Sequence, residues 1–437
     1  MEIKRTFYLN KLIRSMHNGM IKVITGIRRC GKSFLLDPLF KDYLLSIGVS
    51  EENIIKIDLS TSSNLDIINP IILRDYIVSK LNKTDTFYLF IDEIQLCESI
   101  NNPAFDGYKT SDGHTPQINF YQILNDLLSE YKNVDVYVTG SNSHLLSSNV
   151  LTEFRGRGWQ IDLAPLSFKE YIEAFPSKDR RKAFDEYLTF GGMPAMVSYG
   201  NNQDKIKYLT NLFELTYFKD IVEHNNIKED CQIKELTMVL ASGEGSLISI
   251  NKISELFKQK EDKTISRQTI EKYIEVLKDS FLISEVNRFD IKGNKLIASS
   301  KKYYFVDCGL RNALLSFSQY DRGHLMESVI YRDLKRRGYT VNVGVVPVFE
   351  TIKNNSRIRK QYEIDFIATQ GNKKMYIQSA YNIYDDEKLK QETNSFLRIN
   401  DSFRKIIIEG DLYMPYIDKN GIEHVGVIDF LLDKKYD

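Results

Sequence analysis

One eight-residue run limits the folds open to this chain more than any other feature of its sequence. It matches the pattern GxxxxGK[ST] and reads Gly26-Ile27-Arg28-Arg29-Cys30-Gly31-Lys32-Ser33. An apolar, β-rich segment precedes it and a segment rich in Leu and Phe follows it, which is the context in which such a loop binds phosphate. Its glycines let the backbone curl so that successive N–H groups and a helix N-terminus face an anion. The run predicts a phosphate-binding loop, or P-loop, inside an α/β domain.

The pattern around this loop predicts a parallel sheet covered by helices on both faces, because short β-rich runs alternate with helical stretches. We expect strands at Met20 to Thr25, Ile54 to Leu59, Thr86 to Asp92, Val134 to Gly140 and Trp159 to Leu163. Helices are expected at 31 to 47, 69 to 82 and 118 to 132, where apolar residues recur at spacings of three and four. Residues 1–165 therefore form a doubly wound nucleotide-binding domain in this interpretation. The polar segment Cys97 to Gln117 is either a mobile lid or a simple surface insertion.

Two acids, Asp92 and Glu93, end the third expected strand. Behind a P-loop such a pair is typical of a Walker B element, in which Asp92 would hold Mg²⁺ through water and Glu93 would act as the general base. Lys32 would then neutralise the β- and γ-phosphates, and the Ser33 hydroxyl would ligate Mg²⁺. The expected ligands are ATP and Mg²⁺.

Further polar residues follow the fourth and precede the fifth expected strand. Ser141 and Asn142 are candidates for sensing the γ-phosphate, although Thr139, Ser141 or Asn142 could equally cap the next helix. Arg155 and Arg157 lie between glycines and are candidate arginine fingers, supplied by a neighbouring subunit or in cis. The alternative for either arginine is a salt bridge to a surface carboxylate. An arginine finger supplied by a neighbouring subunit would require the chain to form a homo-oligomer.

Cys30 lies inside the expected phosphate cradle. Arg28, Arg29 and Lys32 are close to it in sequence and would lower the pKa of its thiol. Oxidation or alkylation of Cys30 would then block nucleotide entry by its bulk. The alternative is a small side chain that merely fits the loop.

Composition sets wider limits. A chain of 437 residues is long enough for two or three domains. Its 59 basic and 59 acidic residues give no net charge, so a nucleic-acid partner would need a local patch. The four cysteines lack CxxC spacing, and no run of 18 apolar residues occurs. We expect a soluble, cytoplasmic protein with no membrane partner, metal-cysteine site or disulfide framework.

The rest of the chain divides into three expected regions: helical from 166 to 234, winged helix-turn-helix-like from 235 to 299, and a separate α/β domain from 300 to 437. In the middle region, helices at Asn251 to Phe257 and Ser266 to Asp279 precede a strand pair at Ile283 to Phe289 and Asn294 to Ser299. Basic residues there are nearly cancelled by acidic ones. Contact with DNA and a structural or protein-binding role both stay open.

Taken together, the motifs resemble a prokaryotic AAA+-type ATPase family that pairs an AAA core with a C-terminal domain of unknown function (DUF 4143). The resemblance runs through TGIRRCGKS, LFIDEIQ, VYVTGSNSHLLS, FRGRGWQIDLAPLSFKEY, YLTFGGMPAMV, YFVDCGLRNA and EIDFIA, and so covers nearly the whole chain. It implies ATP and Mg²⁺ binding and an AAA+-like strand order.

The C-terminal domain is similar to the restriction-endonuclease fold, which holds Mg²⁺ on carboxylates and uses a lysine. The candidate carboxylates are Glu327, Glu363 and Asp365, whereas Gln378 and Ala380 stand where a nuclease would carry Glu-x-Lys. Lys373 or Lys374 could restore a cation from the preceding turn. We expect a binding module for nucleic acid or protein, and no cleavage of plasmid or linear DNA.

The sequence thus favours an ATPase that works as a nucleotide-driven switch on a nucleic-acid or protein partner. One alternative is an ATP-dependent DNA-processing enzyme with a nuclease tail, which Gln378 and Ala380 argue against. The other is an interaction protein that binds nucleotide without turnover, which Lys32, Asp92 and Glu93 argue against.

Overall fold

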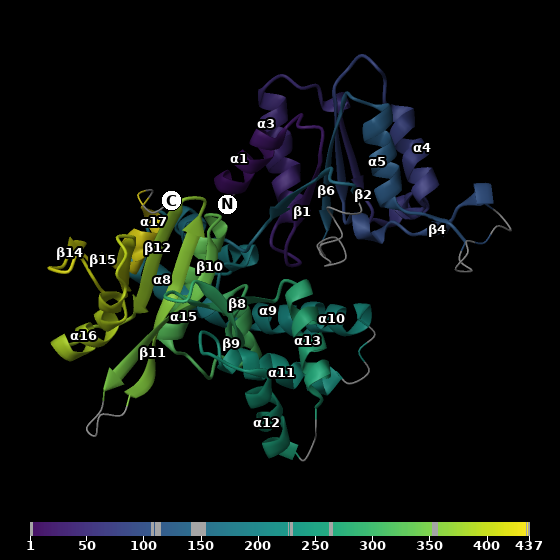
Figure 1. Ribbon diagram of the computed structural model, residues 1–437. Helices are drawn as coiled ribbons and strands as arrows, with labels where there is room; N and C mark the ends of the chain where they lie inside the picture. Colours follow the sequence, from purple (N-terminus) through teal and green to yellow (C-terminus); the bar gives the residue numbers. More distant parts are fainter. Residues whose placement is uncertain are drawn as a thin grey trace. The chain divides into compact units, whose positions relative to one another are not determined.

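A five-stranded parallel sheet forms the centre of Glu2–Pro165, one of two units into which the chain divides in the computed structural model (Figure 1). The structure describes residues 3–105, 109, 115–140, 154–225, 227, 230–261, 265–351, 357–433 and 435. The strands follow the order β2-β3-β6-β1-β7, where these are Ile54–Asp58, Phe87–Asp92, Val134–Gly140, Ile21–Thr25 and Gly158–Asp162. All neighbours pair in parallel. This confirms the predicted sheet and its AAA+-like order.

Helices cover both faces of this sheet. On one face, α4 (Pro70–Lys80) and α5 (Phe120–Glu130) bury Leu73, Ile77, Leu124 and Leu127 against the strands. The other face carries α1 (Thr6–Ser15), a π-helix (Leu35–Phe40) and α3 (Lys41–Ser46), as Figure 1 shows. There the Phe40 ring packs on the rings of Phe90 and Tyr137. Shorter elements of this unit are α2 (Lys32–Phe34), 3₁₀ turns at Glu51–Asn53, Ser62–Ile68, Ile94–Leu96 and Pro103–Phe105, and the strand pair β4 (Ile100–Asn101) and β5 (Gln117–Ile118).

The helix expected at 31 to 47 is not continuous. Asp37 has φ −135° and ψ 111°, which is extended rather than helical. Pro38 follows it, and a proline both lacks an N–H donor and disfavours the α conformation of the residue before it. The prediction of one uninterrupted helix was wrong because it took the apolar spacing as decisive and gave Pro38 too little weight.

The second unit, Leu166–Asp437, is built on a mixed eight-stranded sheet. Its order is β14-β15-β13-β12-β11-β10-β8-β9. These strands are Tyr416–Ile417, Glu423–Gly426, Arg404–Glu409, Lys373–Ala380, Arg357–Gln370, Thr340–Thr351, Ile283–Asp290 and Lys295–Phe305. The expected strand at Asn294 to Ser299 is the first part of a longer strand, β9, so the expected boundary after Ser299 falls inside it. The expected hairpin of β8 and β9 also joins the C-terminal sheet, through parallel pairing of β8 with β10.

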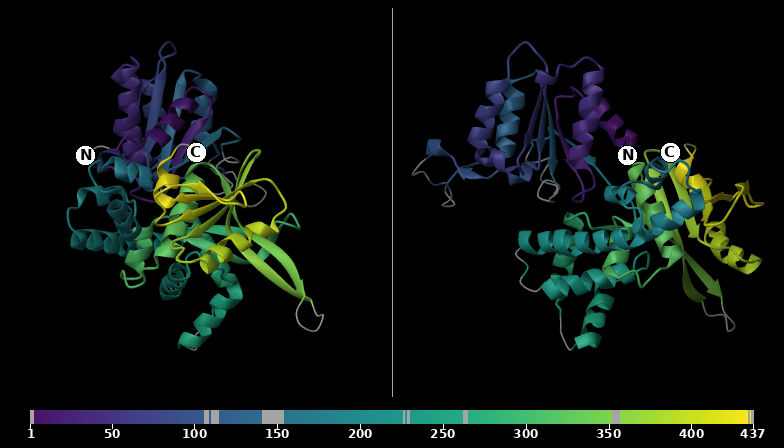
Figure 2. Two further views of the ribbon diagram at one scale, coloured as in Figure 1. Left: turned by 90° about the vertical axis from the view of Figure 1, so that its left-hand side faces the viewer. Right: turned by 180° about the vertical axis from the view of Figure 1, so that it is seen from behind.

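Helices pack on both faces of the second sheet (Figure 2). On one face, α8 (Arg180–Phe190), α15 (Arg322–Arg336) and α17 (Val427–Leu432) share a core with the strands, and on the other Phe396 and Ile399 cover Tyr376 and Ile407. The remaining helices are α7 (Phe168–Glu173), α9 (Asn202–Asn211), α10 (Lys219–His224), α11 (Asp230–Ser242), α12 (Ile250–Glu261), α13 (Arg267–Asp279), α14 (Cys308–Leu314), α16 (Asp386–Asn394), a π-helix at Leu212–Phe218 and 3₁₀ turns at Pro194–Ser198 and Phe396–Arg398. Within the described ranges, no helix is both long and apolar enough to span a membrane.

Two of the sequence motifs meet at Asp307, which is buried at the N-cap of α14. Its carboxylate accepts hydrogen bonds from the backbone N–H groups of Gly192 (2.6 Å) and Leu310 (3.1 Å). A Cβ at Gly191 would lie 2.0 Å from the same carboxylate, and one at Gly309 would lie 2.1 Å from the Phe190 carbonyl oxygen. These glycines are therefore required by close packing. The FGG and DCG sequences hold α8 against α14.

We predict that Asp307→Ala lowers the free energy of unfolding of this unit by about 2 to 4 kcal/mol, because it removes a helix cap and leaves a buried N–H without an acceptor. Asp321 is the matched control, since it caps α15 through the His324 N–H but is exposed. Asp321→Ala should cost about 1 kcal/mol. Urea unfolding followed by circular dichroism measures both, and equal losses would contradict the role given to Asp307.

Candidate functional site

The P-loop turns sharply where β1 ends. Gly26 has φ +147°, and a Cβ at this position would lie 2.1 Å from the Leu163 carbonyl oxygen beside β1. Gly31 has φ +98° and starts α2, so both glycines of the motif occupy conformations that other residues rarely adopt. The loop backbone can therefore curl around an anion at the carboxyl end of β1, which is where ligands bind in folds of this kind.

Lys32 lies inside this loop. Its side chain is 4% exposed, and its ammonium group donates hydrogen bonds to the carbonyl oxygens of Gly26 (3.1 Å) and Ile27 (3.4 Å). These are bonds to neutral acceptors. An anionic phosphate oxygen would make stronger ones, because hydrogen bonds between charged groups are about twice as strong as neutral ones.

Ser33 and Asp92 are brought together across the end of the sheet. The Asp92 carboxylate accepts a hydrogen bond from the Thr139 hydroxyl, and the Ser33 hydroxyl is near enough to favour its charged form. Burial raises the pKa of the Asp92 carboxyl, and the two hydroxyl groups act in the opposite direction. One hydroxyl and one carboxylate beside a phosphate cradle suit Mg²⁺, which proteins usually hold through one or two carboxylates together with substrate phosphates.

Glu93 is held in an unusual backbone conformation next to Asp92. Its φ is +53°, in the left-handed region, and its N–H donates to the Thr139 hydroxyl oxygen (3.0 Å). The Gln95 amide donates a hydrogen bond to the Glu93 carboxylate. A non-glycine residue in this region is strained, and such strain often marks functional sites. Thr139 thus orients both acids.

Sequence reasoning undervalued Thr139 and missed Gln95. It placed Thr139 among the caps of the next helix and preferred Ser141 and Asn142, which lie outside the described residues. The signal was available, because Thr139 is a buried polar residue near the carboxyl end of the strand that pairs with β3. Polar groups at that edge face the ligand site.

Of the two alternatives for Cys30, the structure supports the small side chain that fits the loop and not the reactive thiol. Cys30 is completely buried, and its thiol donates to the Leu163 carbonyl oxygen at 3.4 Å. Burial raises the pKa of this thiol and outweighs the lowering by Lys32 and Arg5. A neutral, buried thiol reacts slowly. Cys30 fills the space under the loop.

The two candidate fingers lie away from the P-loop within their own unit. Arg157 donates hydrogen bonds to the Ser129 hydroxyl (2.9 Å) and to the Asn125 carbonyl oxygen (3.4 Å), both on α5. Its own carbonyl oxygen accepts from the N–H of Ile21, the first residue of β1. It is therefore at the opposite end of β1 from the P-loop. Arg155, two residues earlier, is exposed in the preceding turn.

In the second unit, the three candidate carboxylates converge on one amine. The Lys302 ammonium, on a side chain 3% exposed, lies 2.9 Å from Glu327, 2.8 Å from Glu363 and 3.4 Å from Asp365. The Tyr304 hydroxyl also donates to Glu327 (2.6 Å). The amine takes the central position, and the described residues hold no group of three or more His, Cys, Asp or Glu arranged to bind a metal ion. We name this set the Lys302 cluster.

The residues compared with a nuclease motif lie elsewhere. Along β12, Tyr376 and Ala380 pack in the core on one face, whereas Met375 and Ile377 pack with α15 on the other. Strand alternation therefore puts Gln378 on the face away from the Lys302 cluster. Lys374 lies 5.0 Å from the rings of Tyr376 and Phe403, and Lys373 is exposed at the far end of β12. Neither lysine reaches the carboxylates, and the cation among them is Lys302 instead.

We predict that Glu327→Gln removes a slope of stability with pH. Burial and the Asp365 charge raise the pKa of Glu327 from 4.5 to about 7, so in this window the folded protein keeps a proton that the unfolded chain has released. The free energy of unfolding therefore falls as the pH rises toward about 7, and glutamine has no proton to release. Urea midpoints measured across this window give the slope. Glu363→Gln also removes a partner of Lys302, but at a position 38% exposed, and should keep the slope of stability with pH. An unchanged slope in Glu327→Gln would rule out Glu327 as the group that produces it.

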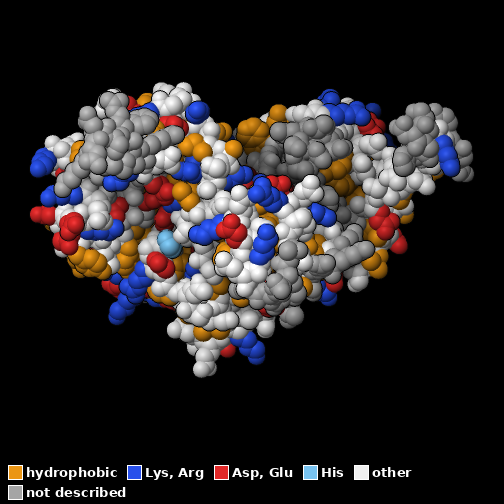
Figure 3. All heavy atoms as spheres, turned by 60° about the horizontal axis from the view of Figure 1, so that its bottom comes forward, with side chains coloured by type: hydrophobic (Ala, Val, Ile, Leu, Met, Phe, Trp, Pro, Cys, Tyr) orange, Lys and Arg blue, Asp and Glu red, His pale blue; other side chains and the backbone are white. Residues whose placement is uncertain are grey.

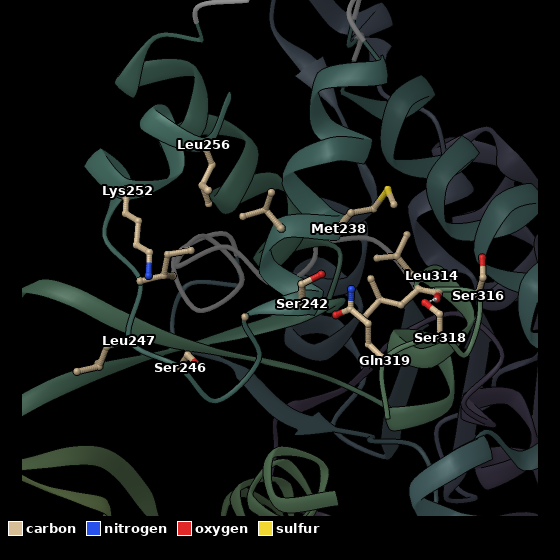
Figure 4. Close-up of a pocket in the computed structure, with 14 residues that line it drawn as sticks. Met238, Ser242, Ser246, Leu247, Lys252, Leu256, Leu314, Ser316, Ser318 and Gln319 are labelled. Carbon is tan, nitrogen blue, oxygen red and sulfur yellow. Dashed lines mark hydrogen bonds between the residues drawn. The ribbon is translucent and has the colours of Figure 1, made fainter. Parts of the chain in front are cut away.

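A cavity in the second unit lies apart from all these residues. Its volume is about 600 Å³, and Figure 4 shows Met238 and Ser242 of α11 and Lys252 and Leu256 of α12 around it. Leu314, Ser316, Ser318 and Gln319 close another side. No residue predicted from the sequence as part of a site lines this cavity.

Two protein-family models match successive parts of the chain. A family model described as an AAA domain matches residues 18–172, which contain the P-loop, Asp92, Glu93 and Thr139. A second model, a domain of unknown function (DUF8612), matches residues 181–321. The resemblance had pointed to DUF 4143, and that assignment and the nuclease-like character stay predictions.

Two uncharacterized proteins match over nearly the full chain. One, from Haemophilus influenzae, is 32% identical over 435 residues, 98% of each chain. The other, from Methanocaldococcus jannaschii, is 30% identical over 426 residues, 93% of this chain and 86% of that one. Among solved structures, the Aeropyrum pernix Orc1 protein in complex with DNA matches at 10% identity with a TM-score of 0.31, over 73% of this chain and 94% of that chain, a likeness too weak to support any conclusion here. The chain belongs to the same family as the two uncharacterized proteins and carries an AAA domain with a P-loop.

Proposed function

We propose that this chain is a Mg²⁺-dependent ATPase that works as a nucleotide-driven switch. The observation that carries the proposal is the position of the Asp92 carboxylate, bonded to Thr139 and near the Ser33 hydroxyl, beside a loop that encloses Lys32. These residues lie on separate segments, and only the fold brings them together. A glycine-rich turn with no role in nucleotide binding would have no need of the Asp92 carboxylate beside it.

In the proposed mechanism, the loop N–H groups and Lys32 bind the phosphates. Lys32 exchanges its bonds to the Gly26 and Ile27 carbonyl oxygens for bonds to β- and γ-phosphate oxygens. Ser33 and Asp92 would hold Mg²⁺, which supplies charge neutralisation for the transferred phosphoryl group. Asp92 is suited to this because its burial makes an unpaired carboxylate unfavourable and a bound cation favourable.

Glu93 is the proposed general base. The Gln95 amide donates to one oxygen of its carboxylate, which keeps further lone pairs that would accept a proton from the attacking water. Thr139 does not touch the water in this scheme and is a positioning residue, since its hydroxyl fixes the Asp92 carboxylate and the Glu93 backbone.

The wider role involves the second unit. This unit has its own sheet and core, so a nucleotide-dependent change at the P-loop could be transmitted to a nucleic-acid or protein partner bound there. The bonds of Arg157 to α5 leave a finger in cis unsupported, so Arg155 or Arg157 would act on a neighbouring copy in a homo-oligomer. Ser141 and Asn142 stay the proposed γ-phosphate sensors.

We predict that Lys32→Ala abolishes tight ATP binding and that Glu93→Gln binds ATP but hydrolyses it at least about 100-fold more slowly, because an amide cannot accept the proton. Glu98→Gln is the matched control, since Glu98 is an exposed acid on the same connection. Nucleotide binding and phosphate release, with and without DNA, RNA and cell extract, are the measurements. Wild-type turnover in Glu93→Gln would remove it as the base, and no turnover in the wild type under any condition would favour a non-hydrolysing binding protein.

We predict that Thr139→Val lowers kcat by about tenfold to 100-fold with little change in KM, because the acids shift while the phosphate cradle stays intact. Thr139→Ser keeps the hydroxyl and should restore most of the rate. A purely structural role would instead make both variants lose stability and leave kcat per folded molecule unchanged.

A further inference from the structure

A two-stranded ribbon extends from the second sheet. β10 has 12 residues and β11 has 14, and they pair with each other as far as Thr351 and Arg357. β8 pairs with β10 only from Val343 to Val345, and β12 pairs with β11 only from Phe366 to Gln370. Within the described strands, residues 346–351 and 357–362 therefore pair only with one another, and Figures 1 and 2 show them running past the rest of the sheet. We name these residues the ribbon.

The ribbon is about 20 Å long at about 3.4 Å per residue. A two-stranded hairpin without a third strand or a packed helix is only marginally stable in water. The base of the ribbon belongs to the core, because Val346 is buried in the cluster of Tyr376 and Phe396, and Val348 and Tyr362 pack against that cluster. Farther out, Lys360 and Gln361 are exposed, so the core does not account for this part. A binding role explains the extension.

Positive charge gathers at this end of the sheet. β11 begins with the sequence RIRK, and Lys360, its fourth residue, is exposed. The turn between β8 and β9 lies alongside, since Asp290 is in register with Val345, and it carries exposed Lys292 and Lys295. The ribbon and the segment Asp290 to Lys295 together hold five basic residues against two acids, Glu350 and Asp290. Asp290 is buried and accepts a hydrogen bond from the Gly293 N–H (2.8 Å).

The winged-helix region offers no such excess. On α13, the exposed residues Arg267 and Lys272 alternate with exposed Glu271 and Glu275. Lys278 is paired with Glu275 at 2.7 Å. On the face drawn in Figure 3, too, basic and acidic side chains are interspersed. The ribbon and the β8–β9 turn are therefore a better place for a polyanion than α13, for which the sequence left contact with DNA open.

We propose that the ribbon and the β8–β9 turn bind duplex DNA. The major groove is about 12 Å wide and admits a two-stranded β-ribbon, while flanking lysines reach phosphates on either side. Affinity of this kind comes mainly from phosphate contacts and falls as salt releases the counterions. The proposal does not depend on ATP hydrolysis.

The test uses the full-length protein and a fluorescein-labelled duplex oligonucleotide in an anisotropy titration at several salt concentrations. Lys292→Gln, Lys295→Gln and Lys360→Gln combined should weaken binding at least tenfold, and the slope of log K against log salt should fall by about 0.9 for each phosphate that is no longer neutralised by a lysine. A matched triple variant at Lys182, Lys207 and Lys335, all exposed in the same unit, removes the same charge elsewhere and should bind like the wild type. ATP binding by every variant confirms that the other unit is intact.

Several results would overturn the proposal. A wild-type protein that does not bind the duplex would do so, as would equal losses in the two triple variants, which would mean that only net charge matters. A larger loss on changing Lys258, Arg267 and Lys272 to Gln would move the site to the winged-helix region. Equal affinity for vesicles containing phosphatidylserine would reduce the ribbon to a general polyanion surface.

Discussion

The close approach of β7 to the start of the P-loop sets the geometry on which the nucleotide-binding unit depends. The Thr25 carbonyl oxygen accepts a hydrogen bond from the Leu163 N–H (2.7 Å). Gly26, which follows Thr25, lies so close to the Leu163 carbonyl oxygen that a Cβ would not fit. The same carbonyl oxygen accepts from the Cys30 thiol. The loop is thereby fixed at both its first and fifth residues. Lys32 and Ser33, which follow immediately, take their positions from this anchor.

The second unit is organised differently, around buried charges. Glu327, Glu363 and Asp365 surround Lys302, and Asp307 joins α14 to the backbone of Gly192. A buried ion group is costly to desolvate and is strongly destabilising when one partner is removed. Residues that a motif comparison would assign to metal-dependent chemistry, Glu327 and Asp365 among them, are here the acceptors of an internal amine.

The sequence predicted the parts of the fold that local patterns determine. Five buried apolar runs indicated the parallel strands, and the P-loop together with Asp92 and Glu93 indicated the site at their carboxyl ends. Features that depend on distant contacts were missed: Lys302 meets its three carboxylates from another strand, and Arg157 pairs with α5 far along the chain. The reactive Cys30 failed for the same reason, because three neighbouring cations in sequence say nothing about burial. Pro38 is the exception among these missed features, since its effect on the helix is local and could have been predicted from the sequence.

The polar groups of the nucleotide site already have partners within the chain, and this bears on how ATP could act as a switch. Lys32 is bonded to loop carbonyl oxygens, Asp92 to Thr139, and Glu93 to Gln95. The Lys32 bonds would be exchanged on binding, and a ligand changes the state only through the difference between the contacts it makes and those it replaces. The phosphates replace neutral acceptors of Lys32 by charged ones, which favours exchange there. In the bond between Gln95 and Glu93, a neutral amide donates to a charged carboxylate, and no phosphate oxygen competes for that amide directly. In the proposed mechanism, nucleotide binding and activation of Glu93 as the base would thus be separate steps. The strained backbone of Glu93 would affect the second step.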